Sequence, residues 1–369
     1  MHYRELDTPA LLIDRERMEA NIRKMVDYAA KNGVKLRPHT KTHKTPALAL
    51  LQEQMGAGGI TVAKVGEAEV MARAGLTDIF IANEIVGDTK LKRIRKLAET
   101  IAISFGLGSI EQAEMIERAF DGAEKKAQVV IEIEVGENRS GIIEEADFLK
   151  LLDYLKTCRN ICLRGVFSHD GDSYSAPSRA AACEKAVVAQ KRTLHFAQMA
   201  KEQGFSIDTV SIGSTPSLAN EAEILAGVTE IRPGTFIFMD ASQANAVGNQ
   251  EVCAATVLAT VMSRPTAERV ILDVGAKGLT MQSRTEGICA VDGLGYLMEY
   301  PNTHIAQMYD EHAIIYDSAF RSAVSIGDKV RIVPVHICPV VNLYDRAYLI
   351  GADGQVEREL EIACRGKLQ

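Results

Sequence analysis

The sequence contains no tryptophan, and aromatic residues make up only 5% of its 369 positions. Lysine and arginine together number 42, against 49 aspartates and glutamates, and no apolar run reaches the roughly 18 residues of a membrane-spanning helix. Stacking platforms for single-stranded nucleic acid need aromatic side chains, and a broad nucleic-acid interface needs a basic face. The sequence therefore argues against a nucleic-acid-binding protein and against a membrane protein.

Paired cysteines are also missing from the sequence. The seven cysteines are an odd number, and none is part of a CxxC pair, so they do not indicate a disulfide framework. The first residues are charged and lack the apolar segment of a secretory signal. We therefore expect a protein of the reducing cytoplasm. With 47% hydrophobic and 25% charged residues, the composition is that of an ordinary globular protein with ample material for a core.

Short apolar, β-rich runs alternate with longer helical patterns over the first two-thirds of the chain. This alternation is typical of parallel strands joined by right-handed crossovers. About eight such units predict a (β/α)8 TIM barrel over residues 1–240, with the first few residues free to join a second domain. An open doubly wound sheet is the alternative, but no GxGxxG follows the first strand. The expected strands are residues 11–13, 35–38, 60–63, 79–82, 101–105, 129–135, 163–168, 210–213 and 230–238.

The pattern changes after about residue 240. Several short strand-like runs follow, separated by turn signals such as Gly327-Asp328 and Gly351-Ala352-Asp353-Gly354. Residues 241–369 therefore predict a mainly β C-terminal domain. No low-complexity linker separates the two parts, so we expect the domains to pack rigidly.

Four expected strand ends carry unusual polar groups, and barrel active sites form at such ends. Residues 36–44, LRPHTKTHK, offer a lysine that could form a Schiff base with an aldehyde cofactor, or they form a solvated basic loop. Arg139 could hold an anionic oxygen, or it is an exposed turn residue. His169 could stack on a flat ring or move protons, or it is a structural histidine.

The fourth place combines two neighbouring strand ends, Ile212 to Ser217 and Arg232 to Thr235. Small residues with free amides and hydroxyls could cradle a phosphate there, and barrels often bind phosphate after strands 7 and 8. Two ordinary turns are the alternative, but their occurrence together at the expected place favours a phosphate site.

The C-terminal part contains a histidine and a cysteine two positions apart, His336 and Cys338. On a strand-like run both side chains point to one face, because side chains alternate along a strand. An imidazole and a thiolate suit Zn²⁺ and leave open positions for water or substrate. Buried structural residues are the alternative, and the spacing identifies no third ligand.

Taken together, these segments resemble the D-threonine aldolase and D-serine dehydratase family, which uses pyridoxal 5'-phosphate (PLP). The resemblance runs from Asp7 to Asn342 and includes, in this order, RPHTKTHK, GSTPS, RPGTFIFMD, DEHA and HICPVVN. It implies an alanine-racemase-like (β/α)8 barrel followed by a mainly β domain, the fold-type III arrangement. It also implies a homodimer that binds a small D-amino acid.

The resemblance implies a role for each candidate residue. Lys41 and His169 are the expected catalytic residues: Lys41 would hold the cofactor as a Schiff base, with Lys44 as the competing lysine, and His169 would stack on the cofactor ring. His336 and Cys338 match the metal pair. The other expected cofactor contacts are Arg139 at the phenolic oxygen, Tyr174 near the pyridine, Arg232 in the place of the pyridine-facing arginine of alanine racemases, and Gly213, Ser214, Thr215, Gly234 and Thr235 at the phosphate.

The implied activity is that of a PLP- and metal-dependent lyase acting on D-3-hydroxy amino acids. D-threonine aldolases typically carry aspartate where Cys338 stands, whereas the D-serine dehydratase branch has cysteine. The cysteine favours Zn²⁺, with Mn²⁺ as the alternative metal, and it favours dehydration to a 2-oxo acid and ammonia. Retro-aldol cleavage to glycine and an aldehyde is the first alternative, and an amino-acid racemase and a non-catalytic PLP carrier are the others.

Overall fold

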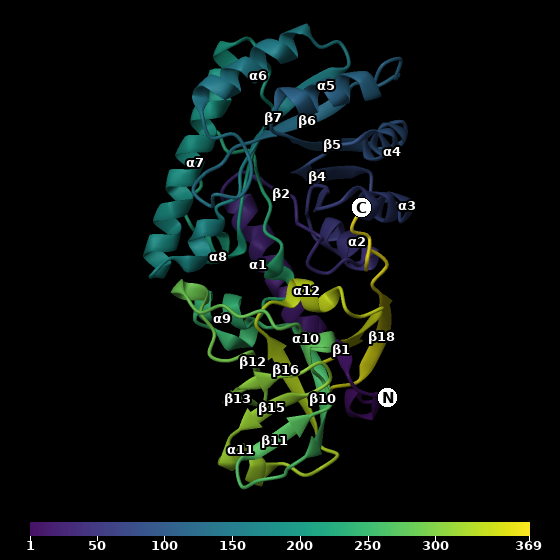
Figure 1. The fold of residues 1–369 in the computed structure, drawn as a ribbon, viewed down its shortest axis with the longest axis vertical. Coiled ribbons are helices and arrows are strands. Elements are labelled where there is room, and N and C mark those ends of the chain that lie inside the picture. The colour runs from purple at the N-terminus through teal and green to yellow at the C-terminus, as the bar shows by residue number, and fades with distance from the viewer.

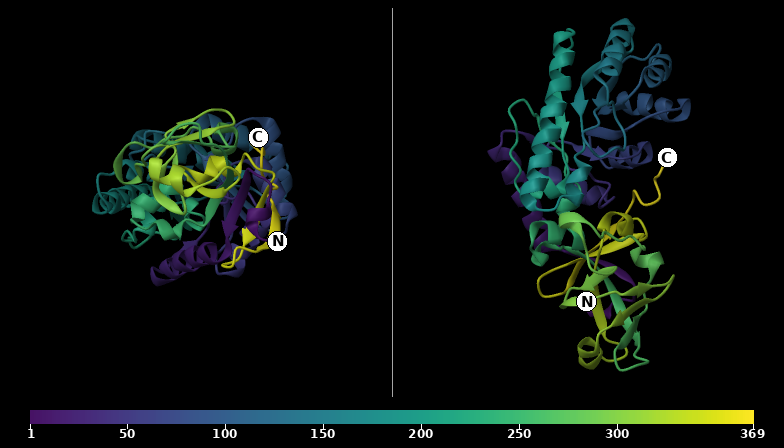
Figure 2. Two further views of the ribbon diagram at one scale, coloured as in Figure 1. Left: turned by 90° about the horizontal axis from the view of Figure 1, so that it is seen from below. Right: turned by 60° about the vertical axis from the view of Figure 1, so that its left-hand side comes forward.

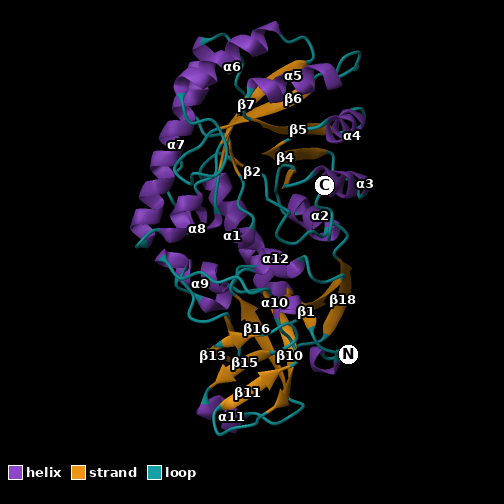
Figure 3. Cartoon of the chain, viewed as in Figure 1, coloured by secondary structure: helices purple, strands orange, loops and turns teal.

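The computed structural model describes residues 1–369, which form two domains stacked along one axis (Figure 1). In this view the upper domain is a sheet surrounded by helices, and the lower domain holds the remaining strands (Figure 3). The side view in Figure 2 shows the same stacking. The chain starts in the lower domain and ends beside the upper one, where the backbone amide of Gly66 donates to the Gln369 carbonyl oxygen (2.8 Å).

The upper domain confirms the predicted barrel. Eight parallel strands follow the order β2-β9-β8-β7-β6-β5-β4-β3, and a parallel bridge between His39 and Thr61 links the two edge strands. The strands are β2 (Lys35–Leu36), β3 (Ile60–Val62), β4 (Asp78–Glu84), β5 (Ala102–Leu107), β6 (Ala127–Glu132), β7 (Ile161–Phe167), β8 (Thr209–Ile212) and β9 (Glu230–Ile231). The helices of this domain are α1 (Arg15–Lys31), α2 (Pro46–Gln54), α3 (Val65–Arg73), α4 (Asp88–Ala98), α5 (Ile110–Ala119), α6 (Glu145–Thr157), α7 (Arg179–Glu202) and α8 (Thr215–Ala219).

Side-chain caps determine where several of these helices begin. Asp14, Ser109 and Ser178 precede α1, α5 and α7, and each accepts a hydrogen bond from the amide three residues further along. Each cap satisfies an otherwise free amide and stabilises the helix by about 1 kcal/mol. None of the helices combines the length and the apolar character that crossing a lipid bilayer requires.

The lower domain is mainly β, as predicted. Its ten-stranded sheet has the main path β13-β12-β16-β10-β1-β17-β18, and β11, β14 and β15 continue it from β10. The strands are β1 (Ala10–Asp14), β10 (Ala255–Ser263), β11 (Arg269–Leu272), β12 (Gly295–Leu297), β13 (Tyr300–His304), β14 (Gln307–Met308), β15 (Ala313–Tyr316), β16 (Lys329–Pro334), β17 (Arg346–Ile350) and β18 (Val356–Glu361). The short helices after the barrel are α9 (Ala241–Val247), α10 (Ala276–Leu279), α11 (Ser318–Ala323) and α12 (Ile337–Val341).

The first expected strand, at residues 11–13, forms but does not enter the barrel. It is part of β1, which pairs antiparallel with β10 and parallel with β17. Four of its five residues are buried, because β1 lies in the middle of the second sheet and is covered on both faces. The first residues thus join the second domain, as the sequence analysis allowed. The eight strands of the barrel correspond to the eight expected strands that follow residues 11–13.

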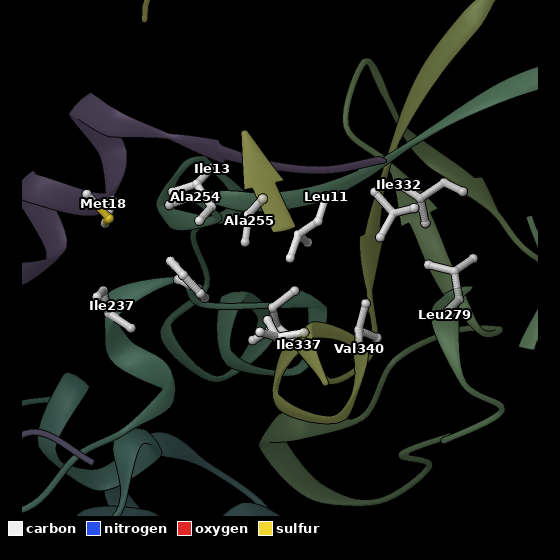
Figure 4. Packing of buried hydrophobic residues seen from close by; sticks show 14 of the residues in the cluster. Leu11, Ile13, Met18, Ile237, Ala254, Ala255, Leu279, Ile332, Ile337 and Val340 are labelled. Carbon is white, nitrogen blue, oxygen red and sulfur yellow. The ribbon is translucent and has the colours of Figure 1, made fainter. Parts of the chain in front are cut away.

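One hydrophobic core joins the two domains. Its 40 buried residues include side chains of α1, of the last barrel strands, of β10 and of α12. Ile337 and Val340 point from α12 into this core, toward Leu11, Ala255 and Ile332 (Figure 4). Both α12 side chains are fully buried. The core therefore fixes α12 against the sheet, beside the barrel.

Replacing Ile337 with alanine should lower the free energy of unfolding by about 2–5 kcal/mol, because the change leaves a cavity between the domains. The measurement is chemical unfolding of the Ile337→Ala variant. Ile326→Ala is the matched control, since Ile326 is 65% exposed and its loss should change stability by less than about 0.5 kcal/mol. Equal stability of both variants would show that α12 is not anchored in this way.

Ion pairs line the end of the barrel that is remote from the second domain. A cavity of about 440 Å³ lies where the strands begin. Arg37 on its wall binds Asp78 (2.8 Å) and Glu230 (2.9 Å), so these charges satisfy one another.

Candidate active site

The site lies where the barrel strands end and face the second domain. Lys41 is in the turn after β2, and its neighbour Thr42 places Oγ1 3.2 Å from Sγ of Cys338 on α12. Oγ1 of Thr235, which follows β9, lies 3.5 Å from the same sulfur. The expected Schiff-base lysine, the last barrel loop and the expected metal pair thus meet within a single chain, and Figure 1 shows α12 at this junction.

The two candidate lysines have different surroundings. Nζ of Lys44 makes a buried ion pair with Oε1 of Glu67 (2.5 Å), and the backbone φ of Lys44 is positive, at 54°. The amine of Lys41 makes no hydrogen bond and no ion pair. Burial lowers the pKa of Lys41, although the nearby Cys338 opposes this shift. Lys41 is therefore the lysine whose amine is free and easily deprotonated.

Free amides and hydroxyls surround the ends of β8 and β9. The backbone N–H groups of Ser214, Thr215, Gly234 and Thr235 donate to no acceptor in the protein. Gly213 has a φ of +147°, and a Cβ there would lie 2.9 Å from the Arg232 nitrogen, so this position requires glycine. The geometry provides a concave set of donors for an anion such as a phosphate.

A buried carboxyl group that the sequence analysis did not select lies beneath these donors. Oδ2 of Asp170 accepts hydrogen bonds from the hydroxyls of Ser214 (3.0 Å) and Ser217 (2.6 Å). Burial raises the pKa of Asp170, and the nearby His169 and the two serine hydroxyls oppose this shift. Asp170 orients the serine hydroxyls and places a titratable group next to the expected phosphate.

A second carboxylate, Glu137, organises the strand-end loops after β6 and β7. Its Oε2 lies 3.0 Å from Nδ1 of His169, and its Oε1 lies 3.2 Å from Arg139. Burial lowers the pKa of His169, and the hydrogen bond that the imidazole donates to Glu137 opposes the shift. The imidazole is therefore held in a fixed orientation, and its deprotonated form is favoured.

Tyr174 lies beside His169, whereas Arg232 is buried inside the barrel. The ring of Tyr174 in η2 (Gly171–Ser175) lies 6.4 Å from that of His169, with the planes 22° apart. Arg232 points into the barrel, where it donates to the Ser168 carbonyl oxygen (2.7 Å) and packs against the rings of Phe80 and Phe167. Burial lowers the pKa of Arg232 to about 10. Both terminal nitrogens of Arg232 thus already donate to protein atoms.

His336 and Cys338 do not lie on a strand, so the expected geometry of this pair is wrong. β16 ends at Pro334, His336 caps α12, and Cys338 is in the first turn of that helix. Pro339 explains the change, because its ring fits the first turn of a helix but lacks the N–H that a strand needs. The Asp240 carboxylate accepts from the amide of Ile337 (3.0 Å) and fixes the start of α12.

Both members of the pair are suited to metal ligation by their buried surroundings. Burial lowers the pKa of His336 to about 4, so the imidazole is uncharged, and Nδ1 lies 3.0 Å from Oε1 of Gln282. Burial raises the pKa of the Cys338 thiol, which a cation would reverse. No group of three or more His, Cys, Asp or Glu side chains is arranged to hold a metal ion. Two protein ligands would leave positions open.

Sequence reasoning missed several residues of this site. Asp240 ends the motif RPGTFIFMD, Asp170 adjoins His169, and Glu137 lies two positions before Arg139. These three residues could have been found from the motifs that contain them. Gln282 and Arg284 belong to an irregular loop of the second domain, and no motif marks them.

Two family models match the chain, one in each domain. The alanine racemase N-terminal domain matches residues 13–242, and a serine dehydratase domain matches residues 254–350. The chain is 33% identical over 365 residues to a D-threonine aldolase of an Arthrobacter species, covering 98% of this chain and 93% of the relative.

Solved structures of similar proteins have the same fold. D-threonine aldolase from Filomicrobium marinum is 30% identical with a TM-score of 0.89, covering 100% of this chain and 98% of that one. D-threo-3-hydroxyaspartate dehydratase from Delftia sp. HT23 is 29% identical with a TM-score of 0.91, covering 98% of each chain. The dehydratase has also been solved with a histidine replaced by alanine and, in the metal-free form, with a cysteine two positions further along replaced by alanine.

Proposed function

Since the chain belongs to the D-threonine aldolase and D-serine dehydratase family of PLP-dependent lyases, we propose that it dehydrates D-3-hydroxy amino acids with the help of a divalent metal ion. The products would be a 2-oxo acid and ammonia. The observation that carries the proposal is the 3.2 Å contact of Cys338 with Thr42, which brings the metal pair beside Lys41.

The residues present fit PLP. The free amine of Lys41 suits an aldehyde, and four unused amides with the adjoining hydroxyls suit a phosphate. Ser214, Thr215, Gly234 and Thr235 would hold the phosphate, and His169 would lie against the ring. When bound, the cofactor supplies an electron sink for the carbanion formed at Cα.

One of the protein's own groups can take the proton from the substrate. Burial lowers the pKa of Lys41, so its amine is suited to take the proton from Cα as general base. Glu137 holds the His169 ring through the 3.0 Å contact with Nδ1 and keeps it from turning. Lys41 and the metal pair come from the same chain, so one subunit supplies both sets of groups.

The metal part of the proposal depends on His336 and Cys338. An uncharged imidazole and a thiol that can become a thiolate form a donor set for Zn²⁺, with Mn²⁺ as the alternative. Support comes from the related dehydratase, whose metal-free variant has lost a cysteine with the same spacing from a histidine. Held there, the ion would act as a Lewis acid toward the 3-hydroxyl group.

Retro-aldol cleavage is the second candidate. A D-threonine aldolase is 33% identical to this chain over nearly its full length, which favours this reaction. Against it stands Cys338, where aldolases typically carry aspartate. A metal ion that activates the 3-hydroxyl could serve either reaction, so the products must decide.

The test is product analysis with D-threonine, using protein loaded with PLP and Zn²⁺ or, in parallel, Mn²⁺. The proposal predicts 2-oxobutanoate and ammonia in equal amounts. Detection of glycine and acetaldehyde would contradict dehydration and establish the aldolase reaction instead. Neither product, with D-serine and D-3-hydroxyaspartate also unchanged, would overturn the lyase proposal.

Asp170 should make cofactor binding depend on pH. Because burial raises the pKa of Asp170, its carboxyl group is neutral at low pH and becomes charged as pH rises, next to the phosphate. PLP affinity of the native protein should therefore fall with rising pH relative to an Asp170→Asn variant, and the variant should bind PLP roughly five to ten times more tightly at pH 8. Titrations followed by absorbance measure both affinities. Pyridoxal, which lacks the phosphate, is the control: an equal gain with pyridoxal would contradict the assignment.

A further inference from the structure

Arg284 has no anionic partner in the structure. It belongs to the loop between α10 and η5 (Gly287–Cys289), and its guanidinium carbon lies 4.6 Å from the centre of the Tyr174 ring. It makes no ion pair and no side-chain hydrogen bond, and its Nε is shielded from solvent without a partner. A buried guanidinium N–H that lacks an acceptor is costly unless a ligand supplies one.

The other arginines around the site, and Lys185, already have partners. Arg139 pairs with Glu137, and Lys185 pairs with Asp172 (2.7 Å). Arg232 donates to Ser168 and Ser211. Lys41 is free, but the proposed reaction uses its amine. Arg284 differs from these arginines in having neither an ion pair nor a side-chain hydrogen bond.

Arg284 lies on the same loop as a residue that contacts the proposed metal pair. Its guanidinium faces the ring of Tyr174, which follows β7 in the barrel domain. Gln282, two residues earlier on the same loop, contacts Nδ1 of His336. The loop therefore borders the space between the Tyr174 ring and the metal pair.

Backbone contacts hold this loop in place. The carbonyl oxygen of Arg284 accepts from the amide of Val291 (2.8 Å), and the amide of Ile288 donates to the carbonyl oxygen of Ala176 in the barrel domain (2.8 Å). Gly287 has a φ of +66°, and a Cβ there would collide with the backbone of Ser175. The guanidinium is thus presented from a segment that is fixed to both domains.

We propose that Arg284 binds a carboxylate of the substrate. The inference rests on the proposed function, in which the substrate is a D-3-hydroxy amino acid. A planar guanidinium with free donors binds carboxylates through two parallel hydrogen bonds. The carboxylate is either the α-carboxylate that all such substrates carry or the second carboxylate of a 3-hydroxyaspartate.

The test measures the affinity of PLP-loaded protein for D-alanine and D-aspartate by calorimetry. Neither amino acid has a 3-hydroxyl group, so neither can be dehydrated or cleaved. Arg284→Met should weaken binding roughly 10- to 100-fold, and Arg284→Lys should restore only part of it. Equal losses for both ligands would assign the α-carboxylate, and a loss confined to D-aspartate would assign the second carboxylate.

Arg358→Met is the matched control, since Arg358 is exposed on β18 and forms no ion pair. Unchanged affinity of Arg284→Met for both ligands would overturn the proposal. Loss of the imine absorption of PLP in that variant would also overturn it, by showing a structural role. Failure of the native protein to bind either amino acid would instead contradict the proposed function.

Discussion

Lys41→Ala should abolish turnover, with a loss of roughly 10³-fold or more, and should remove the visible absorption band of the cofactor imine. The amine of Lys41 is the nucleophile that the aldehyde needs and the base that Cα needs. Because it has no hydrogen-bond or ion-pair partner, its removal should leave the free energy of unfolding nearly unchanged. Absorbance, activity and chemical unfolding of one variant measure these three effects.

Lys44 provides the matched comparison within the same nine-residue segment. Lys44→Met should keep the imine band but lower the free energy of unfolding by about 3–5 kcal/mol, since Glu67 would remain buried without its 2.5 Å partner. An imine that survives in Lys41→Ala and disappears in Lys44→Met would exchange the roles of the two lysines and contradict the assigned site.

Cys338→Ala should lose metal-dependent activity by at least roughly 100-fold while keeping the imine band. The thiol is one of only two protein ligands in the proposed site, so its loss leaves His336 to hold the ion alone. The measurements are bound Zn²⁺ by elemental analysis and turnover with added Zn²⁺. Cys162→Ala is the matched control, since Cys162 is on β7 and is far from α12.

Cys338→Asp extends this prediction to the choice of metal. A carboxylate is a harder ligand than a thiolate, so the variant should be activated better by Mn²⁺ than by Zn²⁺. An alanine variant as active as the native protein in the presence of a chelator would exclude a catalytic metal at this position. The same preference for Zn²⁺ in both the native protein and Cys338→Asp would show that Cys338 is not a ligand.

The fold was largely predictable because it depends on repeated local patterns. Each barrel strand is a short buried run followed by an amphipathic helix, and this periodicity is visible along the chain. The exception is β1: its apolar run suits any buried strand, and only pairing with β10 and β17 determines its sheet. Those partners lie more than 240 residues away in the sequence, so no local pattern could reveal the pairing.

The site residues that lie in contiguous motifs could be predicted from the sequence. Those whose role or geometry depends on tertiary contacts could be predicted only in part. The segment around Lys41 and the glycines at 213 and 234 follow expected strand ends. Which lysine is free depends on Glu67, 23 residues further along. The pair His336 and Cys338 was found, but its geometry was wrong because Pro339 starts a helix. Arg284 could not be found, since only folding brings its loop against Tyr174.

The central claim is that the reaction needs PLP and a metal ion at the junction of the two domains. The most direct test is an omission assay with D-threonine. Protein stripped of metal and cofactor is supplied with PLP, with Zn²⁺, with both or with neither, and 2-oxobutanoate is measured. Thr42, the neighbour of Lys41, contacts Cys338, so product should form at a substantial rate only with both additions. Full turnover with PLP alone would show that the metal pair takes no part in the reaction and would contradict this description of the site.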